Sequence, residues 1–152
     1  MKKILTGIFC HTLSLALLAQ GEEKWALGGS VGVVPKHGTE YFVPTVNVNI
    51  ARRTNLFQQR LSIGAGAEFH FFRTYENHYS GGILFAYSLY KGWSFSATPG
   101  IIASKGMIKP MLQLETSWLF KTRFFDIGPI AEMSFARQDT HNMIGVSFAK
   151  NF

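Results

Sequence analysis

Residues 61–70 read L-S-I-G-A-G-A-E-F-H, and apolar side chains occupy every second position of this stretch. A period of two is typical of a β-strand with two different faces. The second face consists of Ser62, Gly64, Gly66, Glu68 and His70. Most of these residues are small and only one is acidic, and this composition decides which kind of β protein the chain forms.

Seven further stretches repeat this alternation. The eight predicted strands cover residues 25–34, 41–51, 60–72, 79–90, 93–103, 107–120, 124–136 and 142–152. Lys91-Gly92, Lys105-Gly106 and Lys121-Thr122-Arg123 are predicted hairpin turns, with glycine where a positive φ is needed. Consecutive hairpins predict an antiparallel up-and-down sheet of eight strands. Pro44, Pro99, Pro110 and Pro129 predict bulges or local breaks, because proline lacks the donor that a sheet needs.

The polar faces favour a membrane barrel over a soluble one. A soluble barrel would present its polar face to water and would carry many lysines and glutamates there. Here the polar faces are mainly Gly, Ala, Ser, Thr and Asn, and only 16% of all residues are charged, against about 25% in soluble domains. Small side chains suit the narrow lumen of eight strands, and the strands match the roughly 9–11 residues that span a bilayer. We therefore predict an all-β, eight-stranded antiparallel transmembrane β-barrel with a lumen filled by side chains.

The first 21 residues predict a cleavable signal peptide. Lys2 and Lys3 precede an apolar segment from Ile4 to Leu18, and Ala19-Gln20-Gly21 forms a small-x-small cleavage site. The alternative is a retained N-terminal membrane helix. The predicted mature domain, residues 22–152, contains no cysteine, so we expect an exported protein without disulfides.

The net charge of +6 falls to +4 without Lys2 and Lys3. Most of the remaining basic residues lie at predicted turns, and they form no stripe, so we expect no nucleic acid partner.

Together these features resemble the small eight-stranded outer-membrane β-barrels of Gram-negative bacteria, the OmpA-transmembrane/OmpX-like class. The resemblance implies a monomer in the bacterial outer membrane, with both termini periplasmic and the loops at 35–40, 73–78, 104–106 and 137–141 outside. It implies outer-membrane lipid and lipopolysaccharide as surroundings. In that class the assembly machinery reads an alternating last strand with an aromatic end, which Ile144, Val146, Phe148 and Phe152 match. Lys150 departs from this pattern, because an apolar residue is usual there.

Candidate chemistry gathers near the predicted outer end, where His37, His70, His78 and His141 all lie. Neither an H-x-H motif nor a Cys/His ligand spacing is present, so the sequence predicts no metal site and no cofactor. A polar lumen network is also expected, made of Glu68, His70, Lys109, Gln113, Glu115, Asp126 and Glu132. Paired with Arg60 and Lys109, these carboxylates would close the barrel; a narrow cation-favouring conduit is the alternative.

His78-Tyr79-Ser80 allows an enzyme reading. It is similar to the His-x-Ser pair of a family of outer-membrane lipid A deacylases, with Ser80 as nucleophile, His78 as base and Glu76 or Glu68 orienting the base. That family carries the pair nearer the C-terminus. The main interpretation is a barrel protein with a structural or surface-interaction role and no open pore. A lipid-modifying enzyme with this rim site is the alternative, and a soluble periplasmic barrel that binds a small ligand is the third.

Overall fold

The computed structural model describes residues 24–152, except 38–39, 73–76, 105 and 138–139. The strands are β1 (Trp25–His37), β2 (Glu40–Arg53), β3 (Leu61–His70), β4 (His78–Tyr90), β5 (Trp93–Ser104), β6 (Met107–Trp118), β7 (Phe120–Lys121), β8 (Asp126–Ala136) and β9 (His141–Asn151). A single turn, η1 (Leu56–Gln59), follows β2. No helix in this part of the chain is long and apolar enough to cross a membrane. The predicted signal peptide lies outside the described residues.

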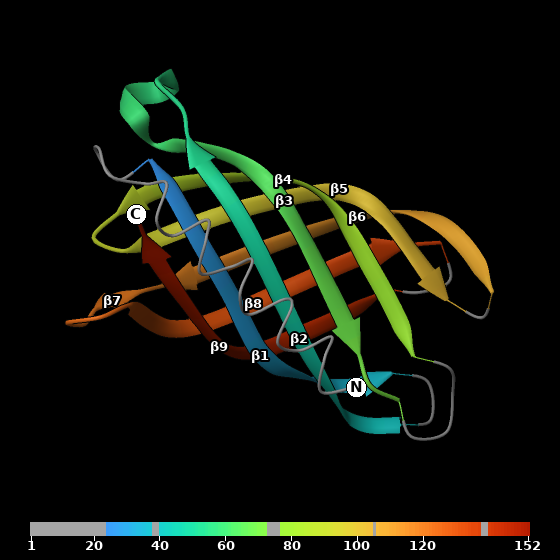
Figure 1. Ribbon diagram of the computed structural model, residues 1–152. Helices are drawn as coiled ribbons and strands as arrows, with labels where there is room; N and C mark the ends of the chain where they lie inside the picture. Colours follow the sequence, from blue (N-terminus) through green and yellow to red (C-terminus); the bar gives the residue numbers. More distant parts are fainter. Residues whose placement is uncertain (1–23, 38–39, 73–76, 105, 138–139) are drawn as a thin grey trace, which may run out of the picture.

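The strands form one closed antiparallel barrel (Figure 1). Each strand from β1 to β6 pairs with the next, β9 pairs with both β1 and β8, and β6 pairs with β8. The short β7 also pairs with β8, so it prolongs β6 beyond a break at Leu119. Because β6 and β7 together form one strand of the barrel wall, the barrel has eight strands around its circumference. This confirms the predicted all-β, eight-stranded antiparallel fold.

The strand ends differ slightly from the prediction. β1 and β2 continue to His37 and Glu40, so the predicted loop at 35–40 shrinks to two residues. Lys91 and Gly92 have φ values of 45° and 83° between the paired residues Tyr90 and Trp93. Two successive positive φ values are the requirement of a type I′ hairpin turn.

The prolines Pro44, Pro99, Pro110 and Pro129 all lie exposed on the outer face and keep the register of their strands. Between β4 and β5 the two pairs nearest Pro99 are missing, yet the register is the same on both sides of this gap. A register shift occurs instead between Ser88 and Tyr90, near the end of β4.

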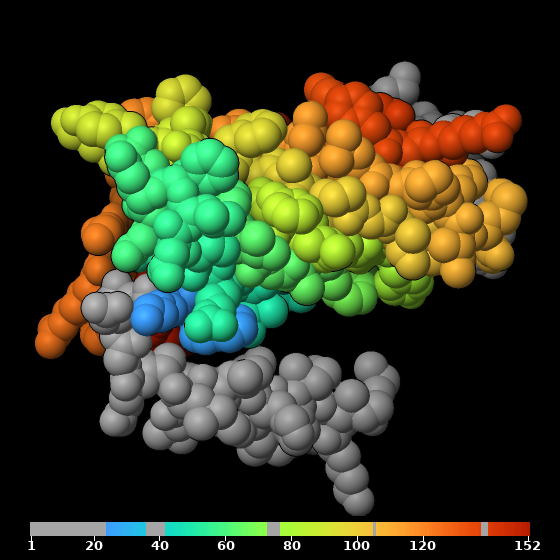
Figure 2. Space-filling view, turned by 90° about the horizontal axis from the view of Figure 1, so that it is seen from above, coloured from blue at the N-terminus to red at the C-terminus, as the bar shows by residue number. Residues whose placement is uncertain are grey.

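The two faces of the sheet are reversed relative to a water-soluble barrel. The buried polar and charged residues include Ser30, Thr45, Asn47, Glu68, His70, Thr98, Gln113, Glu132, Ser134 and His141. Large apolar side chains cover the outside on every long strand, for example Val31, Val48, Ile83, Phe95, Leu112, Phe135 and Val146. Figure 2 shows the continuous outer surface over β3 to β6, with the residues around η1 standing out near one end.

The ends of the barrel differ in composition. We call one the Trp end, because Trp25, Trp93 and Trp118, all the tryptophans of the chain, lie there on the outside. The opposite end is the His end, where β3 finishes at His70 and β4 and β9 begin at His78 and His141.

Basic side chains lie over aromatic rings at the Trp end. The Arg52 guanidinium is 5.8 Å from the Trp25 ring, and the Lys150 ammonium is 5.2 Å from the Phe152 ring. Lys150 is therefore accommodated on the outer face, because its long stem carries the charge to the strand end.

A cavity of about 940 Å³ occupies the Trp-end half of the lumen. It reaches inward from Lys91 and Lys121 at the barrel mouth to Ser96 and Glu115. The predicted filled lumen is therefore wrong for this half. Many inward residues here are too small to meet across the barrel, among them Ala26, Gly28, Ala51, Ser62, Ala86 and Ser94.

Candidate functional site: a buried polar cluster at the His end

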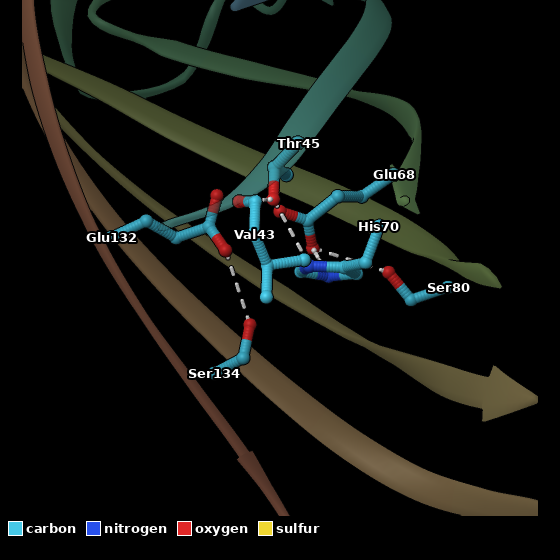
Figure 3. Close-up of polar contacts among 7 residues, drawn as sticks. All are labelled: Val43, Thr45, Glu68, His70, Ser80, Glu132 and Ser134. Atoms are coloured by element: carbon cyan, nitrogen blue, oxygen red, sulfur yellow. Dashed lines mark hydrogen bonds and ion pairs between the residues drawn. The ribbon is translucent and has the colours of Figure 1, made fainter. Parts of the chain in front are cut away.

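A cluster of polar side chains lies inside the His-end half of the lumen (Figure 3). We call it the luminal cluster: Thr45, Glu68, His70, Ser80, Glu132, Ser134 and His141, all buried. They come from β2, β3, β4, β8 and β9. In a strand, residues two apart point the same way, so Glu68 and His70 enter the lumen together from β3, as do Glu132 and Ser134 from β8.

Glu68 and His70 are the centre of the cluster. Glu68 Oε2 lies 3.2 Å from His70 Nε2, and each side chain is only 1% exposed. The Ser80 hydroxyl donates to the same Glu68 oxygen at 3.4 Å. Thr45 Oγ1 is 3.1 Å from His70 Nδ1, on the opposite edge of the imidazole. The contacts from neighbouring strands therefore hold both side chains in one orientation.

His141, on β9, places its imidazole ring beside that of His70. Its ring centroid is 4.4 Å from that of His70, with the two planes at 82°. Glu68, His70 and His141 each offer one donor atom, and these atoms all lie within 4.8 Å of one another. Imidazole nitrogen and carboxylate oxygen are common ligands of transition metals, so these residues form the candidate metal-binding set among the described residues.

A second buried carboxylate adds negative charge. Glu132 Oε1 accepts a hydrogen bond from the Ser134 hydroxyl at 3.1 Å. Its side chain also hydrogen-bonds Gln113 and Glu68, and it interacts electrostatically with Glu115. Two carboxylates hydrogen-bond each other only when they share a proton, and this sharing avoids the cost of burying two negative charges together.

An apolar group lies at the same end of the lumen. Val34, Val43, Ile130 and Met143 are buried against one another, and Phe72 packs against them. Together with the luminal cluster they leave the His-end half almost inaccessible to solvent. Buried side chains therefore close this half of the lumen.

The other predicted lumen residues lie beside or beyond this cluster. Gln113 is buried next to it, because it pairs with Ser134 and its side chain hydrogen-bonds Glu132. Lys109 is half-buried opposite Ile102. Glu115 and Asp126 line the cavity of the Trp-end half, as does Arg60. The predicted network is thus divided between a packed half and a hollow half.

The residues of the predicted rim site point into the lumen. Ser80 is 8% exposed and its hydroxyl donates to Glu68, while His78 Nε2 lies 2.8 Å from the Ser104 hydroxyl. The predicted nucleophile Ser80 therefore contacts Glu68 and not His78, and the serine that His78 does contact, Ser104, is itself buried in the lumen. Glu76 lies outside the described residues. The geometry does not favour a lipid-cleaving site here.

We expect Ser80→Ala to leave lipid A unchanged, because a serine facing the lumen does not meet an acyl chain outside the barrel. The variant should lose about 1 kcal/mol of stability with the Ser80–Glu68 hydrogen bond. Mass spectrometry of lipid A from cells with wild-type or variant protein measures the first effect, and urea unfolding measures the second. A change of acylation that depends on Ser80 would restore the enzyme interpretation.

The residues of the predicted assembly signal lie on and beside the outer face. Ile144, Val146 and Phe148 are exposed on β9. Phe152 exchanges backbone hydrogen bonds with Trp25 at 2.8 and 3.2 Å, which joins the last strand to the first.

No family model, curated protein or solved structure matches this chain.

Proposed function

We propose that the protein is an integral outer-membrane β-barrel with a structural or surface-interaction role. It is a monomer, the Trp end faces the periplasm, the His end faces outward, and the lumen forms no open pore. The observation that carries this proposal is the reversal of the two faces, with carboxylates and imidazoles buried inside and large apolar side chains exposed outside.

The outer surface supports a hydrocarbon environment. Soluble monomers expose contiguous apolar patches of only about 300–600 Å². Here exposed Val, Ile, Leu and Phe side chains continue around the barrel on all eight long strands. In the closed sheet the backbone N–H and C=O groups are hydrogen-bonded between neighbouring strands, which is what the hydrocarbon core of a bilayer requires. The same surface argues against a soluble periplasmic barrel, whose apolar residues would line the ligand cavity.

The Trp end has the composition of a membrane interface. Trp93 Nε1 donates to Thr116 Oγ1 at 2.8 Å and Trp118 Nε1 donates to the Lys91 carbonyl at 3.2 Å, so both rings hold their polar edge toward protein groups. Lys91 and Arg123 lie over the rings of Tyr90 and Phe124. Aromatic girdles with adjacent cations are typical of the headgroup level of barrels.

We propose that the barrel has no open pore because side chains fill the His-end half of its lumen. Eight strands enclose a lumen that side chains are just able to fill. Buried Glu68, His70, Glu132 and His141 occupy it, with the apolar group around Met143 beside them. The hollow Trp-end half is therefore a closed-ended recess.

Tryptophan depth in lipid tests the proposal. The mature chain, refolded into vesicles of brominated phosphatidylcholine, should show stronger quenching by bromines near the headgroups than by bromines near the bilayer centre. The reason is that all three tryptophans lie at one end of the barrel. The loss of tryptophan fluorescence in each type of vesicle measures this quenching.

The matched control is Phe85→Trp in a chain whose three tryptophans are replaced by Phe. Phe85 is exposed in the middle of β4, so its replacement should be quenched most by the deep bromines. Fluorescence that is indifferent to bromine in both proteins would contradict membrane insertion.

A further inference from the structure

We propose that Glu68, His70 and His141 bind a Zn²⁺ ion inside the barrel, with one coordination position left for water or a ligand. This site is independent of what surrounds the barrel, because all three side chains point into the lumen and are buried.

The spacing of the donor atoms fits a tetrahedral ion. Zinc–ligand bonds of 2.0–2.2 Å place two ligand atoms about 3.3–3.5 Å apart. Glu68 Oε2 and His70 Nε2 are already 3.2 Å apart. The third donor, from His141, lies within 4.8 Å of both. All three donor atoms are therefore near the separations that one tetrahedral ion requires.

The neighbouring contacts orient the ligands as zinc sites require. When its Nδ1–H donates to Thr45 Oγ1, His70 carries its lone pair on Nε2, the nitrogen beside Glu68. Ser80 holds the Glu68 carboxylate from the other side. Metal-binding histidines almost always use their second nitrogen in this way, and such partners affect metal affinity 10- to 100-fold.

Two buried carboxylates lie beside one another at the site. Glu68 and Glu132 are 1% and 4% exposed, and a hydrogen bond joins their side chains, which requires a shared proton. A Zn²⁺ ion bound to Glu68 would take over the part of this proton in offsetting charge that is expensive to bury.

The Trp-end cavity carries carboxylates of its own on the way from the barrel mouth toward the site. Glu115 lines this cavity and interacts electrostatically with Glu68. Asp126 lines the same cavity nearer the barrel mouth. These two carboxylates place negative charge between the barrel mouth and the site, which favours the entry of cations into the cavity.

Metal titration of the folded, chelator-treated barrel tests the site. Wild-type protein should bind one Co²⁺ with visible absorption bands of tetrahedral intensity, and Zn²⁺ should displace it. His141→Gln and Glu68→Gln should each weaken Zn²⁺ binding by about 100-fold or more, because each removes one of three protein ligands. Heat-modifiable gel mobility shows whether each variant is folded.

His78→Gln is the matched control. His78 lies in the same half of the lumen, with its ring 6.4 Å from that of His70, but its Nε2 contacts Ser104. Its replacement should change affinity less than about threefold, since it removes no ligand. Absence of a tetrahedral Co²⁺ spectrum in wild type, or equal losses in all three variants, would overturn the assignment. X-ray absorption of the zinc-loaded wild type counts two imidazoles and one carboxylate even if a variant does not fold.

Discussion

Gly82→Ala is expected to lower the free energy of unfolding by about 3 kcal/mol, because it forces a methyl group into a closed contact between strands. Gly82 on β4 and Gly100 on β5 are directly opposite each other. A Cβ on Gly82 would meet the carbonyl oxygen of Pro99, and it would come within 2.8 Å of Gly100 Cα. Both are backbone atoms, which cannot turn aside as a side chain does. Urea unfolding of the refolded barrel, followed by tryptophan fluorescence, measures the loss.

Gly66→Ala is the control for this prediction. Gly66 is the neighbour of Gly82 on β3, in the same cross-strand row. A Cβ there would lie 3.7 Å from Asn49 Cβ, which is ordinary van der Waals contact. Alanine should therefore be tolerated, and the lower entropy of its unfolded chain even favours it slightly. Equal stabilities for the two variants would mean that β4 and β5 are not in such close contact.

The fold was predictable because one local signal repeats eight times. Alternation in stretches such as 61–70 sets which face each side chain takes, and short turns such as Lys91-Gly92 leave antiparallel neighbours as the only pairing. The choice between a polar outside and a polar inside followed from residue size, since Ser62, Gly64 and Gly66 suit a lumen better than a wet surface. None of this needs long-range information.

The sequence predicts only part of the candidate site. The motif Glu68-Phe69-His70 places a carboxylate and an imidazole on one face of a strand, and this is a local signal that a search for H-x-H passes over. The third donor comes from His141, on the strand that closes the barrel. Its approach depends on the stagger of all the strands, which the sequence pattern does not determine.

The hollow half of the lumen was missed for a related reason. Small inward residues predict a lumen that side chains fill, but filling depends on which residues face one another across the barrel. Near the His end, Ile130 and Met143 add bulk inside. Near the Trp end, residues such as Gly28, Ala51 and Ala86 leave the space to solvent.

The prediction that separates a lipid-facing surface from a wet one is Ile83→Arg. Ile83 is 56% exposed near the middle of β4. On a surface in water such a change alters stability by about 0.5 kcal/mol or less. At the midplane of a bilayer an arginine on the outer face of a barrel costs about 2–4 kcal/mol. We expect the larger loss, measured by urea unfolding of barrels in phosphatidylcholine vesicles.

Phe124→Arg is its matched partner, because it introduces the same charge at a similarly exposed aromatic position. Phe124 is 68% exposed beyond the end of β7, next to Arg123 at the Trp end. At the interface an arginine costs only about 0–1 kcal/mol. The difference between the two variants therefore reports depth in the bilayer and cancels the general cost of exchanging an apolar residue for a charge. If Ile83→Arg lost no more stability than Phe124→Arg, the apolar belt would not lie in hydrocarbon, and the soluble barrel would return as the better explanation.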